Sequence, residues 1–388
     1  MYNILTLNKI SPVGLNNFEA DKYAHGDAVE NPDAIMVRSA SMHDMDLPES
    51  VLAVARAGAG VNNIPLDKCS QAGICVFNTP GANANAVKEM VLCGLLLSSR
   101  KIVNAIEWCK TIKDNGSEVP KVVEKGKSAF AGPEIKGKKL GVIGLGAIGI
   151  LVANAAHSLG MEVYGYDPFL SINAAWNLSR SVKHSNDLNE IFENCDYITV
   201  HVPLTPDTKE MINSDSIAKM KDNVRILNFA RGDLANSADV IDALADGKIA
   251  CYVTDFPSAD LIGVDGVIAV PHLGASTPES EENCAEMGVN ELKEYLENGN
   301  IINSVNLPAM QYPRTTDTRL CIIHMNKPTM ISSITGIISK DGINIGNFQD
   351  NNRGEYAYAI IDIDGNINDA AINDLNALDG VIRVRVIK

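Results

Sequence analysis

The feature that most constrains the fold of this chain is a glycine-rich segment, GVIGLGAIG, at residues 141–149. The apolar run 140–143 is typical of a buried strand, and residues 151–159 have the pattern of a helix. A glycine-rich turn between a strand and a helix lets backbone amides approach a pyrophosphate at the helix N-terminus. We therefore predict a dinucleotide site with contacts from Gly144, Gly146, Ala147, Ile148 and Gly149.

An acidic residue follows the next predicted strand. Asp167 comes directly after the apolar run 162–166 and lies about 20 residues beyond Gly144, as expected for the acid that binds the adenosine ribose. A carboxylate there accepts hydrogen bonds from the ribose 2′-hydroxyl and repels a 2′-phosphate. The predicted cofactor is therefore NAD rather than NADP.

Short β-branched apolar runs recur along the chain, separated by segments of helical length, which is typical of parallel α/β sheets. Four runs precede residues 85–108, which we predict as one long helix, and six follow a polar connector, 115–139. The second group is expected to form a complete doubly wound sheet. The runs are 3–6, 34–37, 52–55, 75–78, 140–143, 162–166, 197–200, 225–228, 251–254 and 267–269.

The alternation of buried strands with helices gives way to a different order of elements after residue 319. The remaining segments are expected to alternate as β-α-β-β-α-β, the order of the ferredoxin-like motif. Their predicted ranges are 320–324, 329–341, 343–349, 355–363, 367–378 and 381–387. We predict a small third domain there, because 388 residues are too many for one ordinary core.

The charge composition limits the kinds of molecule that this protein is expected to bind. The 48 acidic residues outnumber the 33 Lys and Arg, giving a net charge of −15, so nucleic acid and anionic membranes are poor partners. Residues 1–10 lack the regions of a signal peptide, and no apolar run approaches a membrane span, so we expect a cytoplasmic protein. The scattered cysteines, without a CxxC pair, indicate no metal site. An anionic substrate would need arginine or lysine gathered locally.

Two side chains behind predicted strands suggest oxidation of an alcohol. Arg231 lies just after the run 225–228, where a guanidinium can hold a carboxylate with two hydrogen bonds. His272 lies in a Gly-containing turn after the run 267–269. Alcohol oxidation needs a base for the hydroxyl proton while hydride leaves, and histidine titrates in the useful range.

These motifs, in this order, resemble the D-isomer-specific 2-hydroxyacid dehydrogenases over residues 1–308. The resemblance implies that Arg231 binds and orients the substrate and that His272 is the acid–base residue. It also implies further cofactor contacts at Pro203 and Ala230. Hydride would pass between C2 of a 2-hydroxy acid and NAD.

The resemblance also implies a discontinuous first domain, to which the helix 278–297 returns. We therefore predict a substrate-binding domain from residues 1–95 and 275–310 and an NAD-binding domain from 96–274. Both are expected to be Rossmann-like, with doubly wound parallel sheets. Residues 317–388 form the third domain.

The family also implies a glutamate that hydrogen-bonds the histidine, and here the sequence departs from the pattern. One alignment of the segment 254–260 puts Thr254 at the family aspartate and Ala259 at the glutamate. The other puts Asp260 at the glutamate and keeps Asp255 for the nicotinamide carboxamide. We expect the second, because it retains both acids, and an Asp260→Ala change should then shift the pH–rate profile.

The predicted substrate residues lie in the first domain. Members of the family that oxidise 3-phosphoglycerate carry an Arg-Ser pair like Arg38-Ser39 in their substrate-binding region. The backbone of Ala59, Gly60 and Val61 is expected to bind a carboxylate. We therefore expect 3-phosphoglycerate as substrate. The alternatives are reduction of another 2-keto acid, such as 2-oxoglutarate or hydroxypyruvate, and a non-enzymatic NAD-binding sensor.

Residues 319–388 resemble an ACT domain, a module that commonly binds amino acids. In family members with this module, a His-x-Asn-x-Pro turn and a Gly-x-Asn-Ile asparagine bind serine at a pair of domains. The matching residues here are His324, Asn326 and Asn344, while Thr329 replaces a frequent glycine. The resemblance implies serine feedback and a homodimer or homotetramer.

Overall fold

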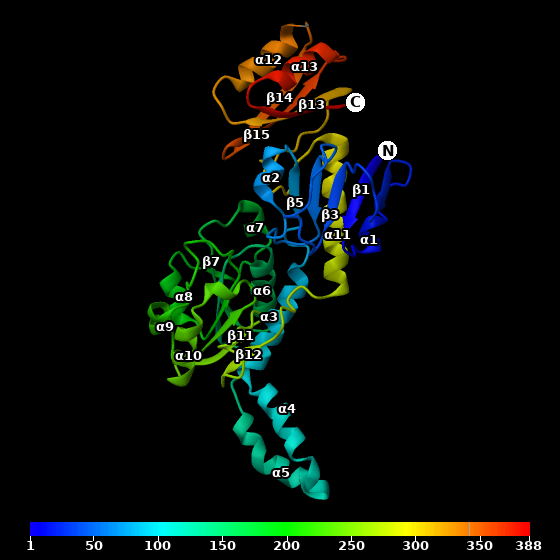
Figure 1. Cartoon of the computed structure of the whole chain (residues 1–388). Coiled ribbons are helices and arrows are strands. Elements are labelled where there is room, and N and C mark those ends of the chain that lie inside the picture. Colours follow the sequence, from blue (N-terminus) through cyan, green and yellow to red (C-terminus); the bar gives the residue numbers. More distant parts are fainter. Residues whose placement is uncertain (341) are drawn as a thin grey trace. The chain divides into compact units, whose positions relative to one another are not determined.

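The computed structural model describes residues 1–340 and 342–388, which form two compact units. The first unit consists of residues 1–83 and 278–388, and the second of residues 84–277 (Figure 1). These bounds differ from the predicted ones, because residues 84–95 lie in the second unit and the predicted third domain shares a unit with the first sheet. The functional division into substrate, NAD and regulatory domains stays a prediction.

The first unit contains a parallel sheet with strand order β2-β1-β3-β4-β5. Helix α11 packs against β4 and β5 and against the short helix α1. The strands are β1 (Tyr2–Leu7), β2 (Tyr23–Gly26), β3 (Ala34–Val37), β4 (Ala53–Arg56) and β5 (Cys75–Asn78), and the helices are α1 (Pro12–Leu15), α2 (Leu66–Gln71) and α11 (Pro278–Asn298). The four predicted strands are confirmed, and β2, a partly exposed edge strand of sequence YAHG, was not predicted.

The second unit contains the cofactor-type sheet, with strand order β12-β11-β10-β9-β6-β7-β8 over its described residues. All six predicted strands are present, and the order is that of a doubly wound Rossmann fold. The strands are β6 (Lys139–Ile143), β7 (Glu162–Tyr166), β8 (Lys183–His184), β9 (Tyr197–Val200), β10 (Val224–Asn228), β11 (Ile249–Thr254) and β12 (Val267–Ala269). The edge strand β8 is too short to give a sequence pattern.

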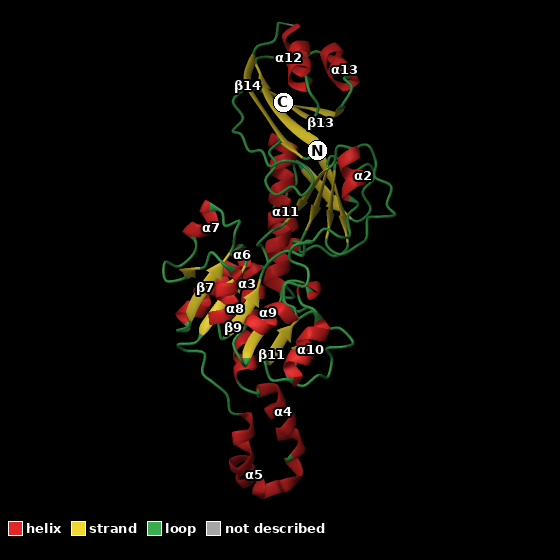
Figure 2. Ribbon diagram, turned by 90° about the vertical axis from the view of Figure 1, so that its left-hand side faces the viewer, coloured by secondary structure: helices red, strands yellow, loops and turns green. Residues whose placement is uncertain are grey.

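Helices cover this sheet on both sides, as Figures 1 and 2 show. Helix α3 packs against α6, β10 and β11, and its Val87, Val91 and Leu95 enter the core of the second unit. This packing explains why α3 belongs to the second unit. The helices are α3 (Ala84–Ser99), α6 (Ala147–Ser158), α7 (Ile172–Trp176), α8 (Leu188–Asn194), α9 (Ser214–Lys219) and α10 (Ser237–Ala245), with a 3-10 turn η3 (Gly232–Leu234).

Residues 102–130, called the arm below, differ from the predicted long helix 85–108 and the predicted connector 115–139. The expected single helix 85–108 breaks at Lys101, whose ψ of 55° is not helical. The expected connector is largely helical, and α4 and α5 form a hairpin that projects from the second unit (Figures 1 and 2). Trp108 holds the hairpin together, because it packs on Phe130 with ring centroids 5.3 Å apart. The elements are α4 (Ile102–Thr111), η1 (Lys113–Glu118), α5 (Val119–Gly126) and η2 (Lys127–Phe130).

The last part of the first unit, residues 318–388, is called the tail below. Its predicted β-α-β-β-α-β order is confirmed, and the sheet is antiparallel with strand order β14-β15-β13-β16. Helices α12 and α13 lie side by side on one face of the sheet (Figure 1). The elements are β13 (Thr318–Met325), α12 (Met330–Lys340), β14 (Ile345–Arg353), β15 (Tyr356–Ile363), α13 (Asp369–Ala377) and β16 (Val381–Ile387).

The other face of the tail sheet joins the core of the first unit. Cys321 and Ile323 of β13 and Tyr358 of β15 belong to the same buried cluster as Phe77 and Tyr295. The neighbouring residues of β13 face α12 and α13 instead. The two central strands of the tail sheet, β13 and β15, are therefore buried on both faces.

Arginines of the tail donate hydrogen bonds to backbone carbonyls of the first unit. Arg383 donates to Val51 O (2.6 Å) and Ala72 O (2.9 Å). Arg385 donates to Leu296 O at 3.1 Å, and its guanidinium lies 4.5 Å from the centroid of the Tyr295 ring. The Arg385 hydrogen bond satisfies a carbonyl in the C-terminal turn of α11, where intrahelical partners run out, whereas Arg383 binds carbonyls just before β4 and after α2.

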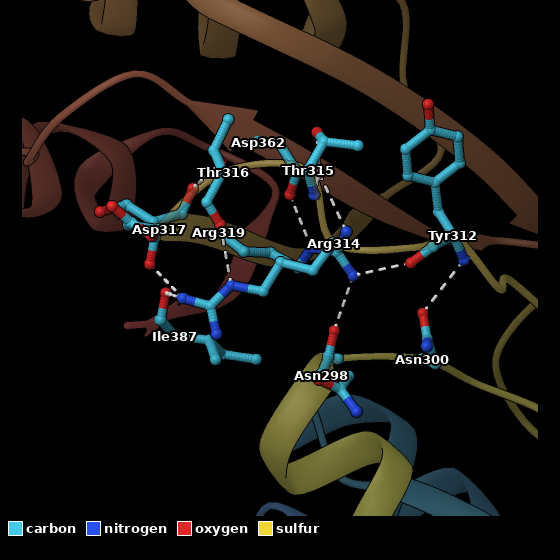
Figure 3. A network of polar contacts seen from close by, with 12 residues as sticks. Asn298, Asn300, Tyr312, Arg314, Thr315, Thr316, Asp317, Arg319, Asp362 and Ile387 are labelled. Atoms are coloured by element: carbon cyan, nitrogen blue, oxygen red, sulfur yellow. Dashed lines mark hydrogen bonds and ion pairs between the residues drawn. The ribbon is translucent and has the colours of Figure 1, made fainter.

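The most buried of these arginines is Arg319, which is fully inaccessible to solvent. Its Nε donates to Asp362 Oδ1 at 2.6 Å, and its Nη1 donates to the carbonyls of Asn298 and Tyr312 (Figure 3). Burial alone would raise the pKa of Asp362, but hydrogen bonds from Arg319 and Thr315 lower it below its ordinary value. The pair is therefore charged and links the tail to the end of α11.

Glu291 is a second buried acid, in the middle of α11. Its Oε1 accepts a hydrogen bond from Asn303 Nδ2 at 2.6 Å, while its Oε2 is buried without a partner among the described residues. Burial raises the pKa of Glu291 to about 8. Its carboxyl group is therefore mostly protonated at neutral pH.

We predict that Arg319→Met destabilises the protein by about 3–5 kcal/mol, because it leaves the Asp362 charge buried without its partner. The free energy of unfolding is measured by urea denaturation. Lys327→Met, which breaks the exposed pair with Asp379, is the control and should cost less than about 1 kcal/mol. Equal losses in the two variants would contradict a stabilising role for the buried pair.

We also predict that Glu291 makes stability fall as pH rises. Above pH 4.5 the unfolded chain loses this proton, whereas the folded chain keeps it until about pH 8, so stability declines across this interval. Glu291→Gln should flatten that part of the pH dependence in urea midpoints, whereas Glu279→Gln, exposed on the same helix, should not. An unchanged slope in Glu291→Gln would show that other groups cause the decline.

Candidate active site

The glycine-rich turn adopts a conformation that only glycine fits. Gly144 follows β6 with φ of 92°, and a Cβ there would lie 2.6 Å from the His201 carbonyl. A Cβ on Gly149 would lie 1.9 Å from the Gly144 carbonyl, so this glycine allows the helix to approach the turn. A Cβ on Gly146 would meet nothing within 4 Å, and α6 begins at Ala147. The exposed helix N-terminus therefore has room for a phosphate.

Asp167 is fixed beside this turn. Its Oδ2 accepts from Leu145 N and its Oδ1 from Phe169 N, both at 2.8 Å. The carboxylate thus holds the turn and stands where the second strand of the sheet ends. A dinucleotide fits this set, with amides for its pyrophosphate and an acid for its ribose.

The other predicted cofactor residues also follow strands of the second unit. Pro203 is exposed in the loop after β9, where its carbonyl accepts from Thr208 Oγ1 at 2.6 Å. Ala230 follows β10, and its N–H donates to Asn228 Oδ1 at 3.2 Å. Both lie at the carboxyl ends of strands, as the glycine-rich turn does.

Arg231, Asp255 and His272 line one pocket of about 430 Å³ in the second unit. Asn228, buried at the end of β10, donates to the Arg231 carbonyl at 2.8 Å and to the Tyr252 hydroxyl oxygen at 3.1 Å. This contact fixes the backbone at Arg231, whereas the side chain is exposed. The guanidinium donates from Nη1 to the Ala230 carbonyl at 2.6 Å, and its exposure leaves it open to an anionic ligand as well.

His272 lies in a turn with an unusual backbone. Its φ is 47°, in the left-handed region, and its N–H donates to the carbonyls of Asp255 (2.9 Å) and Val270 (3.0 Å). The imidazole is exposed and lies 4.8 Å from the Phe256 ring centroid. The turn therefore presents the imidazole to the pocket.

Asp255 is almost completely buried at the end of β11, with 1% of its surface exposed. Its Oδ2 accepts from Gly274 N at 3.0 Å, while its Oδ1 is buried without a partner among the described residues. Burial raises the pKa of Asp255, and the Gly274 N–H and the charges of His272 and Arg231 oppose the rise. Asp255 is thus electrostatically coupled to both predicted catalytic side chains.

The structure does not bring Asp260 to this pocket. Its side chain is exposed, and it is not among the pocket-lining residues. The neighbouring Leu261 is buried in the core of the second unit and also lines the pocket, whereas the Asp260 side chain faces solvent. The expectation that Asp260 supports His272 therefore has no basis in this arrangement.

The predicted substrate residues lie at the carboxyl edge of the first unit's sheet. Arg38 follows β3 and forms an ion pair with Glu281 of α11, with a separation of 2.6 Å. Sequence analysis did not single out Arg56, which ends β4 and donates from Nε to the Arg38 carbonyl at 3.1 Å. Its guanidinium occupies the space that a Cβ on Gly58 would need. An arginine at a strand end is the signal that could have revealed it.

The neighbouring backbone is fixed by asparagines. Asn8 Oδ1 accepts from the N–H of Ser39 (3.2 Å), and Asn78 Nδ2 donates to the Ala59 carbonyl at 2.6 Å. Ala59 is exposed and Gly60 and Val61 are half-buried. The loop 59–61, Arg38 and Arg56 therefore lie together at the carboxyl edge of the first unit's sheet.

The predicted effector residues are not brought together within one chain. His324 is buried, and its Nε2 lies 3.2 Å from Asp350 Oδ1. Asn326 follows at the same end of the tail sheet, whereas Asn344 precedes β14 at the other end and donates to Asp364 at 2.7 Å. Thr329 has φ of 70°, the region that favours the glycine it replaces.

Two further properties concern residues 1–340 and 342–388 only. Within them, no helix has the length and apolar character needed to cross a membrane. Within the same ranges, no three His, Cys, Asp or Glu side chains are grouped so that they could hold a metal ion.

The fold and this pocket define an NAD-dependent dehydrogenase, and comparisons with known proteins agree. The model of the D-isomer specific 2-hydroxyacid dehydrogenase NAD binding domain matches residues 95–274. D-3-phosphoglycerate dehydrogenase from Haemophilus influenzae is 32% identical over 98% of this chain and 94% of that protein. The enzyme of the same name from Bacillus subtilis is 34% identical, and the match covers 80% of this chain and 60% of that longer protein.

A solved structure shows the same fold. The NAD⁺-bound 3-phosphoglycerate dehydrogenase from Entamoeba histolytica is 24% identical and has a TM-score of 0.59, with 79% of this chain and 98% of that one covered. The chain belongs to the D-isomer-specific 2-hydroxyacid dehydrogenase family, and its cofactor is NAD.

We predict that Asp167→Ala raises the KM for NAD by roughly 10- to 100-fold, because a hydrogen bond to a charged group contributes about 1.5–3 kcal/mol. The ratio of kcat/KM values for NAD and NADP should move towards NADP. Asp222→Ala, which removes an exposed partner of Lys248, is the control. Unchanged discrimination between NAD and NADP in Asp167→Ala would exclude the proposed ribose contact.

Proposed function

We propose that this protein oxidises D-3-phosphoglycerate to 3-phosphohydroxypyruvate, the first step of serine biosynthesis. The C2 hydroxyl proton passes to His272 and hydride leaves C2, so that the C2–O bond becomes a carbonyl. The chemistry that NAD would supply when bound is a hydride acceptor. Gly144, Gly146 and Asp167 are the residues that would hold it.

The observation that carries the proposal is the pairing of Arg231 and His272 in one pocket at the carboxyl edge of the cofactor-type sheet. A guanidinium binds a 2-hydroxy carboxylate with two hydrogen bonds and fixes its orientation. A neutral imidazole accepts the hydroxyl proton at physiological pH. These two groups are what oxidation of a 2-hydroxy acid requires.

The choice of a phosphorylated acid rests on the first unit. In a chain with a net charge of −15, Arg38 and Arg56 stand close together at one sheet edge. Two guanidinium groups are suited to a phosphate, and Ser39 adds a hydroxyl group. The relatives named D-3-phosphoglycerate dehydrogenase support the same substrate.

We further propose that the tail is an ACT-type module through which serine inhibits the enzyme. His324 and Asn326 lie at one end of the tail sheet and Asn344 at the other. A site that uses all three therefore needs two tails, which supports a homodimer or homotetramer. The match to the Haemophilus influenzae relative extends over nearly the whole chain and so includes most of the tail.

The test measures NADH formation with 3-phosphoglycerate, with and without serine, and NADH oxidation with 2-oxoglutarate and hydroxypyruvate. We predict that Arg38→Ala lowers kcat/KM for 3-phosphoglycerate by roughly 10- to 100-fold, because a charge-assisted phosphate contact is lost. Reduction of 2-oxoglutarate should be retained.

Arg180→Ala, a change at an exposed arginine of the second unit, is the matched control and should leave both activities unchanged. Equal loss with phosphorylated and unphosphorylated acids would argue against a phosphate contact at Arg38. Turnover of 2-oxoglutarate alone would favour the rival reductase, and NADH binding without turnover of any of these acids would favour a non-enzymatic sensor.

A further inference from the structure

The carboxylate that supports His272 is not fixed by sequence pattern in this chain. The segment 254–260 contains Asp255 and Asp260, and either aligns with a family acid. The two residues have opposite environments in the structure. Asp255 is buried in the pocket wall, whereas Asp260 is exposed outside the pocket.

Asp255 holds the turn that carries His272 by two hydrogen bonds. Its backbone carbonyl accepts from His272 N at 2.9 Å, and its side-chain Oδ2 accepts from Gly274 N at 3.0 Å. The bonds fall on either side of Leu273, so they fix the residue that carries the imidazole and the residue two places on. A Cβ on Gly274 would lie 2.9 Å from Oδ2, so glycine allows this close approach.

The second carboxylate oxygen has no partner of its own. Asp255 Oδ1 is buried and, among the described residues, accepts no hydrogen bond. Burying an acceptor without a donor is unfavourable, so this oxygen is expected to take a partner when one becomes available. Protonation of His272 during the reaction supplies a cation in the same pocket.

No other ionisable residue among those that line the pocket has a buried carboxylate. The ionisable residues that line the pocket are Arg231, Asp233, Tyr252, Asp255 and His272. Arg231 is a cation, the Tyr252 hydroxyl is buried against Asn228, and the Asp233 side chain is exposed to solvent. Asp255 is therefore the desolvated negative group that faces the pocket.

We propose that Asp255, rather than Asp260, is the positioning residue on which His272 depends. Its carboxylate fixes the histidine turn through Gly274 and balances the imidazolium charge that forms when His272 accepts the substrate proton. This inference rests on the proposed function, since it assigns the acid behind the proposed base. It also replaces the expected role of Asp255 as a ligand of the nicotinamide carboxamide.

The test compares Asp255→Asn with Asp260→Asn, the same change at two acids five positions apart. Asparagine keeps an acceptor for Gly274 N–H and removes the charge. Asp255→Asn should lower kcat/KM for 3-phosphoglycerate by roughly 10- to 100-fold, less than the roughly 10²–10⁴-fold that an acid–base group itself contributes, because His272 is retained. The pH–rate profile should move to lower pH, because a neighbouring negative charge favours protonated histidine. Asp260→Asn should match the unchanged protein in both.

Two readouts separate this role from the alternatives. NADH affinity, measured by fluorescence, should change less than about twofold in Asp255→Asn, because the proposed role gives Asp255 no contact with the cofactor. A large loss of NADH affinity with an unmoved pH profile would restore the carboxamide role and overturn the proposal. A shifted profile in Asp260→Asn alone would overturn it as well.

The protonation of His272 can also be measured without substrate. The measurement is hydrogen–deuterium exchange at the imidazole C2, followed by peptide mass spectrometry. The pH of half-maximal exchange should fall in Asp255→Asn and stay in place in Asp260→Asn. An equal midpoint in Asp255→Asn and the unchanged protein would refute the inference. If the unchanged protein turns over none of the acids tested, the proposed function fails, and the exchange measurement still decides the role of Asp255.

Discussion

The rest of the structure depends on one constraint, the parallel hydrogen bonding of two sheets that helices cover. Such strands are buried on both faces, so polar side chains find solvent only at the strand ends. All parallel strands of a sheet point the same way, and their carboxyl ends therefore share one edge. Arg38, Arg56, Asp167, Arg231 and Asp255 each stand at or just after such an end. The positions of these polar groups thus follow from the topology of each sheet.

The fold could be predicted from sequence wherever a strand is buried on both faces. Runs such as Ala34–Val37 and Tyr197–Val200 have no exposed residue and gave a clear pattern. The strands β2 and β8 lie at sheet edges, where partial exposure or shortness removes the signal. The arm was predicted only in part: the start of α4 was assigned to the long helix 85–108, whereas Gly116, Pro120 and Gly126 favoured a connector where α5 lies. None of the residues in α4 and α5 is buried, so neither helix forms part of a core.

The site was predictable to the extent that its residues occupy fixed positions after strands. The glycine-rich turn, Asp167, Arg231 and His272 all follow this rule. Asp255 also follows this rule, because it comes directly after β11, but the family pattern pointed to Asp260 as the partner of the histidine, and only the burial seen in the structure separates the two acids. The contact between the tail and the first sheet was also not anticipated. The sequence of β13 has apolar residues at both odd and even positions, so both faces of this strand are apolar, as in a strand buried on two faces.

The discontinuity of the first unit has a consequence for folding during synthesis. Residues 84–277 are continuous in sequence, so the second unit can form its core as soon as it has left the ribosome. The first sheet, although synthesised earlier, must wait for α11, which packs on β4 and β5, and for the tail strands that join its core. Contacts over such long sequence separations form slowly. The apolar faces of β1 to β5 are therefore exposed longest, and the N-terminal sheet is the last to be completed and the one most in need of protection from aggregation.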